Sequence, residues 1–272
     1  MNEQEILPYH VIEPETGRVP ILISVPHSGT AFPDNIRDHY DQKLIEAPDD
    51  TDWFVHKLYD FAPAMGITMI RAEYSRWVID LNRDPESAPL YDDGRLITEL
   101  CPTSTFAGEP IYKDHHMPGR KEIERRLEVY YWPYYNKVSE ILKALKSKFG
   151  KVLLWDAHSI RQYVPLIRKE VFPDVILGDN NEKTADRLLI ETALVSLKNS
   201  KLKVEHNYPF KGGHLTRYFG KPEEKQHALQ LEMTKINYMD NKEIHYDIDR
   251  ANIVRKRLKA TFDNLIKQLK SL

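Results

Sequence analysis

The sequence predicts an α/β fold, a three-layer α/β/α sandwich around a central mixed sheet. Short apolar runs of strand length alternate with longer segments in which apolar residues recur every three or four positions, the period of an amphipathic helix. The chain has 272 residues, which is enough to bury one large core. No stretch has the composition of a linker, so we expect a single domain over 1–272.

The expected strands are rich in leucine and β-branched residues, which is typical of buried strands. In chain order they are 21–25, 67–72, 77–81, 152–155, 175–177, 201–204 and 228–233. In an open α/β sheet, the ligand crevice lies outside the carboxyl ends of the strands. The residues that follow these runs are therefore the first candidates for a functional site.

Four longer segments have a helical pattern. A helix over 51–65 should end near Gly66, and a helix over 119–149 should be kinked or split at Pro133. Two more are expected at 181–198 and 249–272. The stretch 84–118 is rich in Pro, Gly, Asp and Thr and has little periodicity, so we interpret it as a rim or lid over the site.

Composition excludes several classes of partner. The formal net charge is -2, so there is no electrostatic footprint for nucleic acid or an anionic membrane. The one cysteine, Cys101, has no neighbour for a disulfide or a metal cluster.

No run approaches the ~18 apolar residues that would span a bilayer, and the first residues are polar. We expect a cytoplasmic protein with a small-molecule ligand. The oligomeric state stays open, because the aromatic run 130–135 suits either the core or an interface.

Two histidines follow two buried apolar runs in the same way. His27 ends the first run in Pro26-His27-Ser28-Gly29, and His158 follows another in Asp156-Ala157-His158-Ser159. If the runs are neighbouring strands, the imidazoles converge and could bind a metal ion, which needs about three protein ligands. Asp52 is our first choice for the third ligand and Asp50 the second. The alternative is a pair of histidines that are only hydrogen-bonded at strand ends.

Two further carboxylates belong to this hypothesis. Asp156 lies two residues before His158 in an extended segment and could orient an imidazole. Glu232 stands in the apolar run Leu229-Gln230-Leu231-Glu232-Met233, where a carboxylate is costly unless it is paired or functional. It is the candidate general base for hydrolysis. A structural ion pair is the alternative.

The segment 75–84 contains donors suited to an acidic ligand. Arg76, Asn82 and Arg83 bracket a short apolar run, and guanidinium groups bind carboxylates at two points. As a strand, the segment would place Asp80 on the same face as Arg76, where the two could pair, and Arg83 on the opposite face. A purely structural network remains the alternative.

A glycine-rich motif follows later in the chain. In Lys211-Gly212-Gly213-His214, the glycines would allow a backbone amide to approach a ligand. His214 and Arg217 add donors, so we take Gly213, His214 and Arg217 as candidate substrate-binding residues. The motif alone is a weak signal, since paired glycines also mark ordinary turns.

Taken in order, these motifs resemble those of the N-formylglutamate amidohydrolase family. The matching segments are Ser24-Val25-Pro26-His27-Ser28-Gly29, Asp50-Thr51-Asp52-Trp53, Ser75-Arg76-Trp77-Val78-Ile79-Asp80-Leu81-Asn82-Arg83, Asp156-Ala157-His158-Ser159, Lys211-Gly212-Gly213-His214 and Ala228-Leu229-Gln230-Leu231-Glu232-Met233. They extend from about residue 20 to 240, and their common order is more specific than any one motif.

The resemblance implies a fold similar to that of zinc carboxypeptidases and aspartoacylases. It implies one divalent metal ion, zinc in the first instance, on His27 and His158, with Asp52 as the third ligand. It also implies that Arg76, with Asn82 and Arg83, grips a substrate carboxylate, that Arg76 helps the metal stabilise the oxyanion, and that Glu232 is the general base.

The implied reaction is the hydrolysis of N-formyl-L-glutamate to formate and glutamate in histidine breakdown. The chain departs from the carboxypeptidase pattern at Thr30, where a His-x-x-Glu motif would have glutamate. Two alternatives remain: a metal-dependent deacylase or carboxypeptidase-like enzyme for another N-acyl amino acid, and a non-catalytic carboxylate-binding protein.

Overall fold

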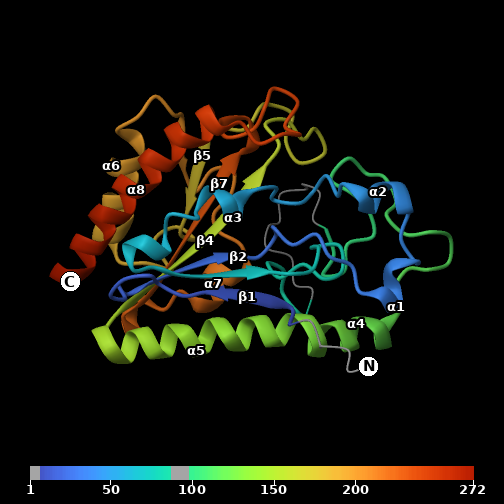
Figure 1. Ribbon diagram of the computed structural model, residues 1–272, viewed down its shortest axis with the longest axis horizontal. Coiled ribbons are helices and arrows are strands. Elements are labelled where there is room, and N and C mark those ends of the chain that lie inside the picture. The colour runs from blue at the N-terminus through green and yellow to red at the C-terminus, as the bar shows by residue number, and fades with distance from the viewer. Residues whose placement is uncertain (1–6, 87–97) are drawn as a thin grey trace.

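The computed structural model describes residues 7–86 and 98–272, and a mixed sheet forms the middle layer of this part of the chain (Figure 1). Its strands are β1 (Tyr9–Ile12), β2 (Ile21–Val25), β3 (Thr68–Ala72), β4 (Val152–Ile160), β5 (Val175–Gly178), β6 (Val204–His206) and β7 (Gln226–Thr234). Their order across the sheet is β1-β3-β2-β4-β7-β5-β6. The four strands β3, β2, β4 and β7 are parallel, whereas β1 at one edge and the β5–β6 pair at the other run antiparallel to their neighbours.

Helices cover both faces of this sheet. They are α1 (Asp34–Arg37), α2 (Gln42–Glu46), α3 (Val55–Leu58), α4 (Arg120–Arg126), α5 (Trp132–Phe149), α6 (Arg187–Lys198), α7 (His214–Phe219) and α8 (Ile248–Ser271), with short turns η1 (Pro63–Met65), η3 (Pro222–Glu224) and η4 (Lys235–Asn237) and a π-helical segment η2 (Leu127–Tyr131). Figure 1 shows α5 along one face and α6 with α8 on the other. Among the described residues, no helix is both long and apolar enough to cross a membrane.

Strand β2 shows how the sequence builds three layers. All five of its residues are buried. Ile21, Ile23 and Val25 belong to the apolar cluster that includes α6 and α8, whereas Leu22 belongs to the cluster beneath α5. A strand that buries both faces needs a continuous apolar run rather than an alternating one. The predicted α/β/α sandwich with a mixed sheet is confirmed.

The expected strand at 77–81 is wrong. Trp77, Val78, Ile79 and Leu81 all pack in the same cluster beneath α5, so their side chains do not alternate between two faces. The backbone turns instead, with Val78 N bonded to Ser75 O and Asp80 N bonded to Leu100 O. The apolar run 77–81 has the length of a strand, but in the structure it is a buried segment without regular secondary structure.

Helix lengths also differ from expectation. The helix expected over 51–65 is broken into α3 and η1, and Pro63 at the start of η1 has no N–H to continue a helix. The long helix over 119–149 is split, as predicted, although the π-helical segment η2 lies just before Pro133. Helix α6 begins only at Arg187, where Asp186 accepts from Leu188 N as the N-cap. Strand β1 and helices α1, α2 and α7 were not predicted.

Candidate metal centre and active site

Strand β4 is longer than predicted and carries His158 inside the strand rather than after it. In the parallel pairing of β4 with β7, His158 is opposite Glu232 and Asp156 is opposite Gln230. Side chains two apart on a strand point to the same face. These four polar residues therefore share one face of the sheet, next to the carboxyl end of β2.

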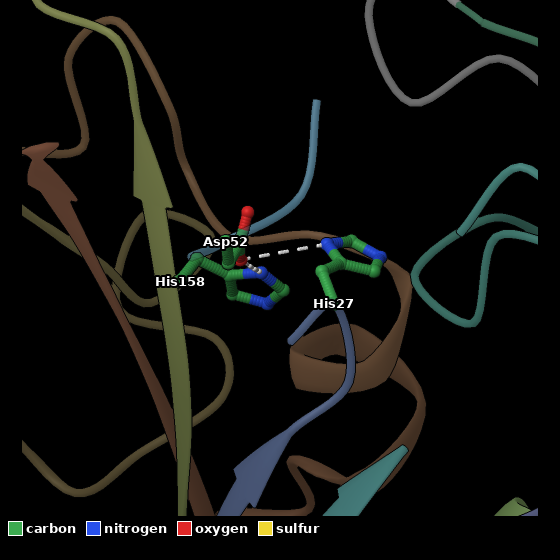
Figure 2. Close-up of side chains that lie close together, drawn as sticks. All are labelled: His27, Asp52 and His158. Atoms are coloured by element: carbon green, nitrogen blue, oxygen red, sulfur yellow. Dashed lines mark hydrogen bonds and ion pairs between the residues drawn. The ribbon is translucent and has the colours of Figure 1, made fainter. Parts of the chain in front are cut away.

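His27, Asp52 and His158 lie together at this edge (Figure 2). The imidazole ring centroids are 4.8 Å apart. Asp52 Oδ2 is 3.1 Å from His158 Nδ1 and 3.7 Å from His27 Nδ1. All three side chains are buried, and one ligand atom from each lies within 4.8 Å of the others. The structure thus brings together the three residues that the sequence suggested as metal ligands.

Two atoms of this group are chemically unsatisfied. His27 Nδ1 and Asp52 Oδ1 are buried and have no hydrogen-bond partner among residues 7–86 and 98–272. Leaving a polar atom buried without a partner costs roughly 1–3 kcal/mol. Two imidazoles and one carboxylate are also a typical ligand set of catalytic zinc sites. The residues present therefore fit a divalent metal ion.

The other nitrogen of each imidazole faces a carboxylate. His27 Nε2 is 2.7 Å from Asp80 Oδ1, and His158 Nε2 is 3.1 Å from Asp156 Oδ2. Such a carboxylate keeps the proton on Nε2, so Nδ1 is the atom that can bind a metal, which is the arrangement of many metal-binding histidines. Without a metal, His158 Nδ1 instead donates to Asp52 Oδ2 at 3.1 Å. Both Nδ1 atoms are the ones near Asp52.

Asp50 has a different task from Asp52. Its carboxylate accepts from Trp77 Nε1 at 3.0 Å and from Phe106 N at 3.1 Å. It therefore joins the segment that begins at Ser75 to the loop around Phe106, and it is not part of the group of three potential metal ligands. Residues 98–118 of the expected lid contribute this contact, whereas 87–97 lie outside the described residues.

Burial affects the two imidazoles differently. Burial and the nearby Arg76 lower the pKa of His27. Burial also opposes a charge on His158, but the Asp156 and Asp52 carboxylates outweigh it and hold the pKa of His158 well above its usual value. His158 is therefore the imidazole that attracts a proton when nothing else neutralises the carboxylates around it.

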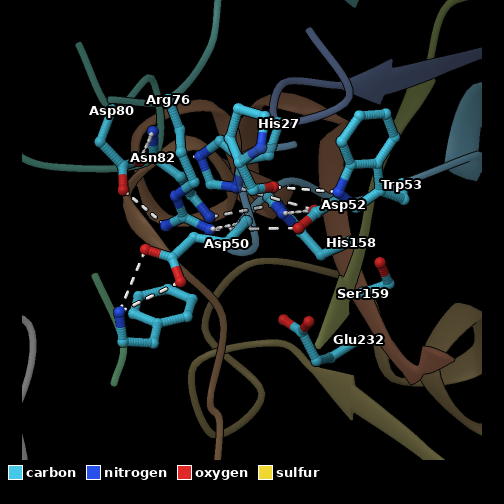
Figure 3. A network of polar contacts seen from close by, with 12 residues as sticks. His27, Asp50, Asp52, Trp53, Arg76, Asp80, Asn82, His158, Ser159 and Glu232 are labelled. Carbon is cyan, nitrogen blue, oxygen red and sulfur yellow. Dashed lines mark hydrogen bonds and ion pairs between the residues drawn. The ribbon is translucent and has the colours of Figure 1, made fainter. Parts of the chain in front are cut away.

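Glu232 lies beside this group (Figure 3), and its side chain is half-buried. Its Oε2 accepts from Gln230 Nε2 at 3.3 Å, and among the described residues it has no ion-pair partner. Desolvation raises the pKa of Glu232 to about 8, and Asp52 adds to this rise although His158 opposes it. A carboxyl group with a pKa near neutrality can exchange a proton with a reacting group.

Arg76 and Asp80 form a buried pair, as predicted, with Nη2 and Oδ2 2.6 Å apart. Arg76 Nη1 is 4.0 Å from Asp52 Oδ1, and its guanidinium lies 4.8 Å from the centre of the Phe106 ring. Arg83 was expected on the opposite face of a strand, but the irregular backbone turns it to the same side, where its Nη1 is 3.8 Å from Asp80 Oδ2. Asp80 thus contacts His27 and both arginines, and of these contacts the sequence predicted only the pair with Arg76.

Asn82 joins this network to the start of α7. Its Nδ2 is 3.1 Å from His158 Nε2, and its Oδ1 accepts from Leu215 N at 2.9 Å. A Cβ at Gly213 would lie 2.2 Å from Asn82 Nδ2, so only glycine allows this approach. The Gly213 amide itself donates to Gln230 Oε1 at 2.6 Å. The Gly213 amide, which we expected to donate to a ligand, therefore donates to a side chain of the protein itself.

The remaining candidates lie on α7. His214 is half-buried, with Nδ1 3.7 Å from Asp84 Oδ2, and Arg217 Nε donates to Gly212 O at 2.9 Å. Both side chains are thus on the helix that begins beside Asn82. His214 lies near Asp84, the residue after the segment 76–83, and neither side chain belongs to the group around Asp52.

Comparisons with known proteins show which family the chain resembles. The family model described as N-formylglutamate amidohydrolase matches residues 19–239. A protein named N-formylglutamate deformylase from Pseudomonas putida is 40% identical over 92% of this chain and 93% of its own length. Its namesake from Pseudomonas aeruginosa is 38% identical over 94% of this chain and 96% of its own length.

A solved structure is similar over the whole chain. The crystal structure of N-formylglutamate amidohydrolase from Ralstonia eutropha JMP134 superposes with a TM-score of 0.80 at 26% identity, covering 98% of this chain and 99% of that one. The family match covers more than half of the sequence, and the two Pseudomonas relatives are aligned over nearly all of it. The chain therefore belongs to the N-formylglutamate amidohydrolase family.

Proposed function

We propose that this protein is a metal-dependent amidohydrolase that hydrolyses N-formyl-L-glutamate to formate and L-glutamate. The observation that carries the proposal is the buried group of His27, Asp52 and His158, with two unsatisfied ligand atoms, beside a carboxyl group of raised pKa. The names of relatives that are about 40% identical over most of the chain supply the substrate.

We assign the metal to His27 Nδ1, His158 Nδ1 and the Asp52 carboxylate, and the metal itself as zinc. Both imidazoles hold their Nε2 proton toward a carboxylate, which leaves Nδ1 as the donor. A bound divalent ion supplies Lewis acidity: it polarises the formyl carbonyl and lowers the pKa of water.

Glu232 is the proposed general base. Its carboxylate takes the proton from the attacking water and returns it to the departing amide nitrogen, so one group serves both transfers. Arg76 is assigned to the negative charge that develops on the formyl oxygen. The buried ion pair with Asp80 holds the Arg76 guanidinium in place, so little reorganisation is needed when that charge appears.

Asn82 and Arg83 are the proposed carboxylate-binding pair, with Gly213, His214 and Arg217 around them. His158 Nε2 cannot donate to Asp156 and accept from Asn82 Nδ2 at once. When Nδ1 holds a metal ion, the Nε2 proton belongs to the Asp156 contact. Asn82 Nδ2 can then donate to another acceptor, and a substrate carboxylate fits this role.

Metal analysis joined to a formate-release assay tests the proposal. We expect about one zinc ion per chain from the three ligands, and loss of activity after chelation. Glu232→Gln should keep the metal and lose about 10²- to 10⁴-fold in kcat, because it removes the proton transfer. His158→Ala should lose both metal and activity.

Comparing N-formylglutamate, N-formylaspartate and N-acetylglutamate as substrates tests the acyl group and the amino acid separately. Full activity after chelation, or normal turnover by Glu232→Gln, would contradict the mechanism. Faster turnover of another N-acyl amino acid would contradict the assigned substrate and leave the metal site standing.

A further inference from the structure

Buried side chains hold the backbone of the segment 76–83. Within residues 7–86 and 98–272 no strand pairs with this segment, and a buried carbonyl without a donor is costly. The donors come from side chains elsewhere in the chain. The Tyr40 and Tyr112 hydroxyls donate to Trp77 O at 3.3 and 3.4 Å, and Arg126 Nη1 donates to Val78 O at 2.9 Å. Tyr135 Oη donates to Leu81 O and Tyr131 Oη donates to Arg83 O, both at 2.8 Å.

The last two bonds enclose the proposed carboxylate-binding pair. Leu81 O precedes Asn82, and Arg83 O follows the pair directly. Tyr131 and Tyr135 are both fully buried, and their rings stack with centroids 4.3 Å apart and an interplanar angle of 13°. Packing of the two rings therefore fixes the positions of both hydroxyl groups, in addition to their hydrogen bonds to the segment 76–83.

The π-helical segment η2 explains how both tyrosines reach this position. Tyr131 is its last residue, and Tyr135 lies in the first turn of α5. A π turn inserts one extra residue into a helix and is frequent at functional sites. Pro133 then lies in the first turn of α5, where a proline is tolerated because the backbone N–H groups of a first turn have no partner within the helix. All four tyrosines of the aromatic run 130–135 are buried and Trp132 is partly buried, which favours the core interpretation of that run.

Tyr135 also touches the second group of candidate substrate-binding residues. Its ring centroid is 5.5 Å from that of Phe219 and 6.1 Å from that of His214, both on α7. The stacked tyrosines therefore pack between the segment 81–83 and α7. They can set the distance between the pair Asn82 and Arg83 and the candidate substrate-binding residues on α7.

We propose that Tyr131 and Tyr135 are positioning residues that aim Asn82 and Arg83 at the carboxylate of the substrate. The inference rests on the proposed function, and it goes beyond it by giving a role to hydroxyl groups that do not touch the substrate. Removing either hydroxyl removes its hydrogen bond to a carbonyl that flanks the pair, which allows the pair to shift. Substrate binding should suffer, while the metal group and Glu232 keep their places.

Tyr131→Phe and Tyr135→Phe test this, with Tyr134→Phe as the matched control. Tyr134 lies on the same helix and is equally buried, but its hydroxyl contacts Ser24 Oγ at 2.9 Å instead of the segment. We expect KM for N-formylglutamate to rise about tenfold in the first two variants with kcat within about twofold, the signature of lost uniform binding. Tyr134→Phe should lower the melting temperature similarly and leave KM unchanged.

A double-mutant cycle separates positioning from general loosening. In an Arg83→Ala background, Tyr131→Phe should raise KM by less than about twofold, because the group it aims is gone. Full additivity, or an unchanged KM in both single variants, would overturn the inference. Wild-type protein that releases no formate would instead contradict the proposed function, so the two failures are distinguishable.

Discussion

The two halves of the site are supported in different ways. His158 and Glu232 lie opposite each other on β4 and β7, where backbone hydrogen bonds of the sheet fix both strands. Asn82 and Arg83 lie on a segment that has no strand partner among the described residues, and tyrosine hydroxyls and Arg126 donate to its carbonyl groups. A ladder distributes the support over many equivalent bonds, whereas this segment depends on a few separate side-chain donors. The irregular half should therefore be the more sensitive to loss of one distant polar group.

Asp80 is where the two halves meet. One oxygen contacts His27 Nε2 at 2.7 Å, and the other contacts Arg76 Nη2 at 2.6 Å (Figure 3). Burial opposes the charge on Asp80, but Arg76 and Arg83 outweigh it and hold the pKa of Asp80 well below its usual range. A single charged group thus orients a proposed metal ligand and the proposed oxyanion donor.

Asp80→Asn should have the largest effect among the changes that break this link. An amide can accept from His27 or face Arg76 with its oxygen, but not both, so one contact is lost. We expect roughly 10- to 100-fold weaker metal binding together with lower kcat. Metal competition with a chelator and formate release at saturating metal measure the two effects.

Asp156→Asn is the comparison for Asp80→Asn. Asp156 contacts His158 but not Arg76, so its loss should weaken metal binding and spare activity once metal is saturating. If Asp80→Asn recovered fully at saturating metal as well, the proposed link through Arg76 would be wrong.

The sequence revealed the regular half better than the irregular half. Apolar runs that end in His27 and precede His158 mark neighbouring strands, because strand burial depends on local composition. Asp52 could be ranked before Asp50, but only the fold shows that Asp50 bonds to Trp77 and Phe106.

The segment 77–81 was misread as a strand because its apolar residues look the same in both conformations. Two of its supports, Tyr135 and Arg126, are about 50 residues away in the chain, and no local pattern connects them to it. The double contact of Asp80 was hidden for the same reason, since His27 lies 53 residues before it.

A smaller effect is expected in the half of the site that the sheet supports, where zinc binding should change the pKa of Glu232. With its pKa at about 8, this carboxyl group is mostly protonated at pH 7 in the metal-free protein. A cation on the nearby ligands favours the charged form, so zinc should lower the pKa by roughly one unit or more and release protons. The carboxylate that a general base needs then exists at pH 7.

Carbon-13 NMR of labelled glutamate side chains, titrated with and without zinc, measures this change, and Glu232→Gln identifies the signal. A midpoint that stays near 8 in the zinc-bound protein would mean that the metal lies too far from Glu232 to act with it.

The smallest expected effect tests the sheet support directly. Ser24 lies on β2, and its Oγ shares a hydrogen bond of 2.9 Å with Tyr134 Oη. Ser24→Ala removes one buried side-chain bond, and the Tyr134 hydroxyl keeps Ile70 O as an acceptor at 3.5 Å. We expect about 1 kcal/mol less free energy of unfolding in urea. KM and kcat should stay unchanged, because the backbone pairing of β2 with β4 still holds His27 and His158 together. A rise in KM comparable to that of Tyr131→Phe would show that the sheet half depends on single side-chain bonds as much as the segment 76–83, and the contrast between the two halves would fail.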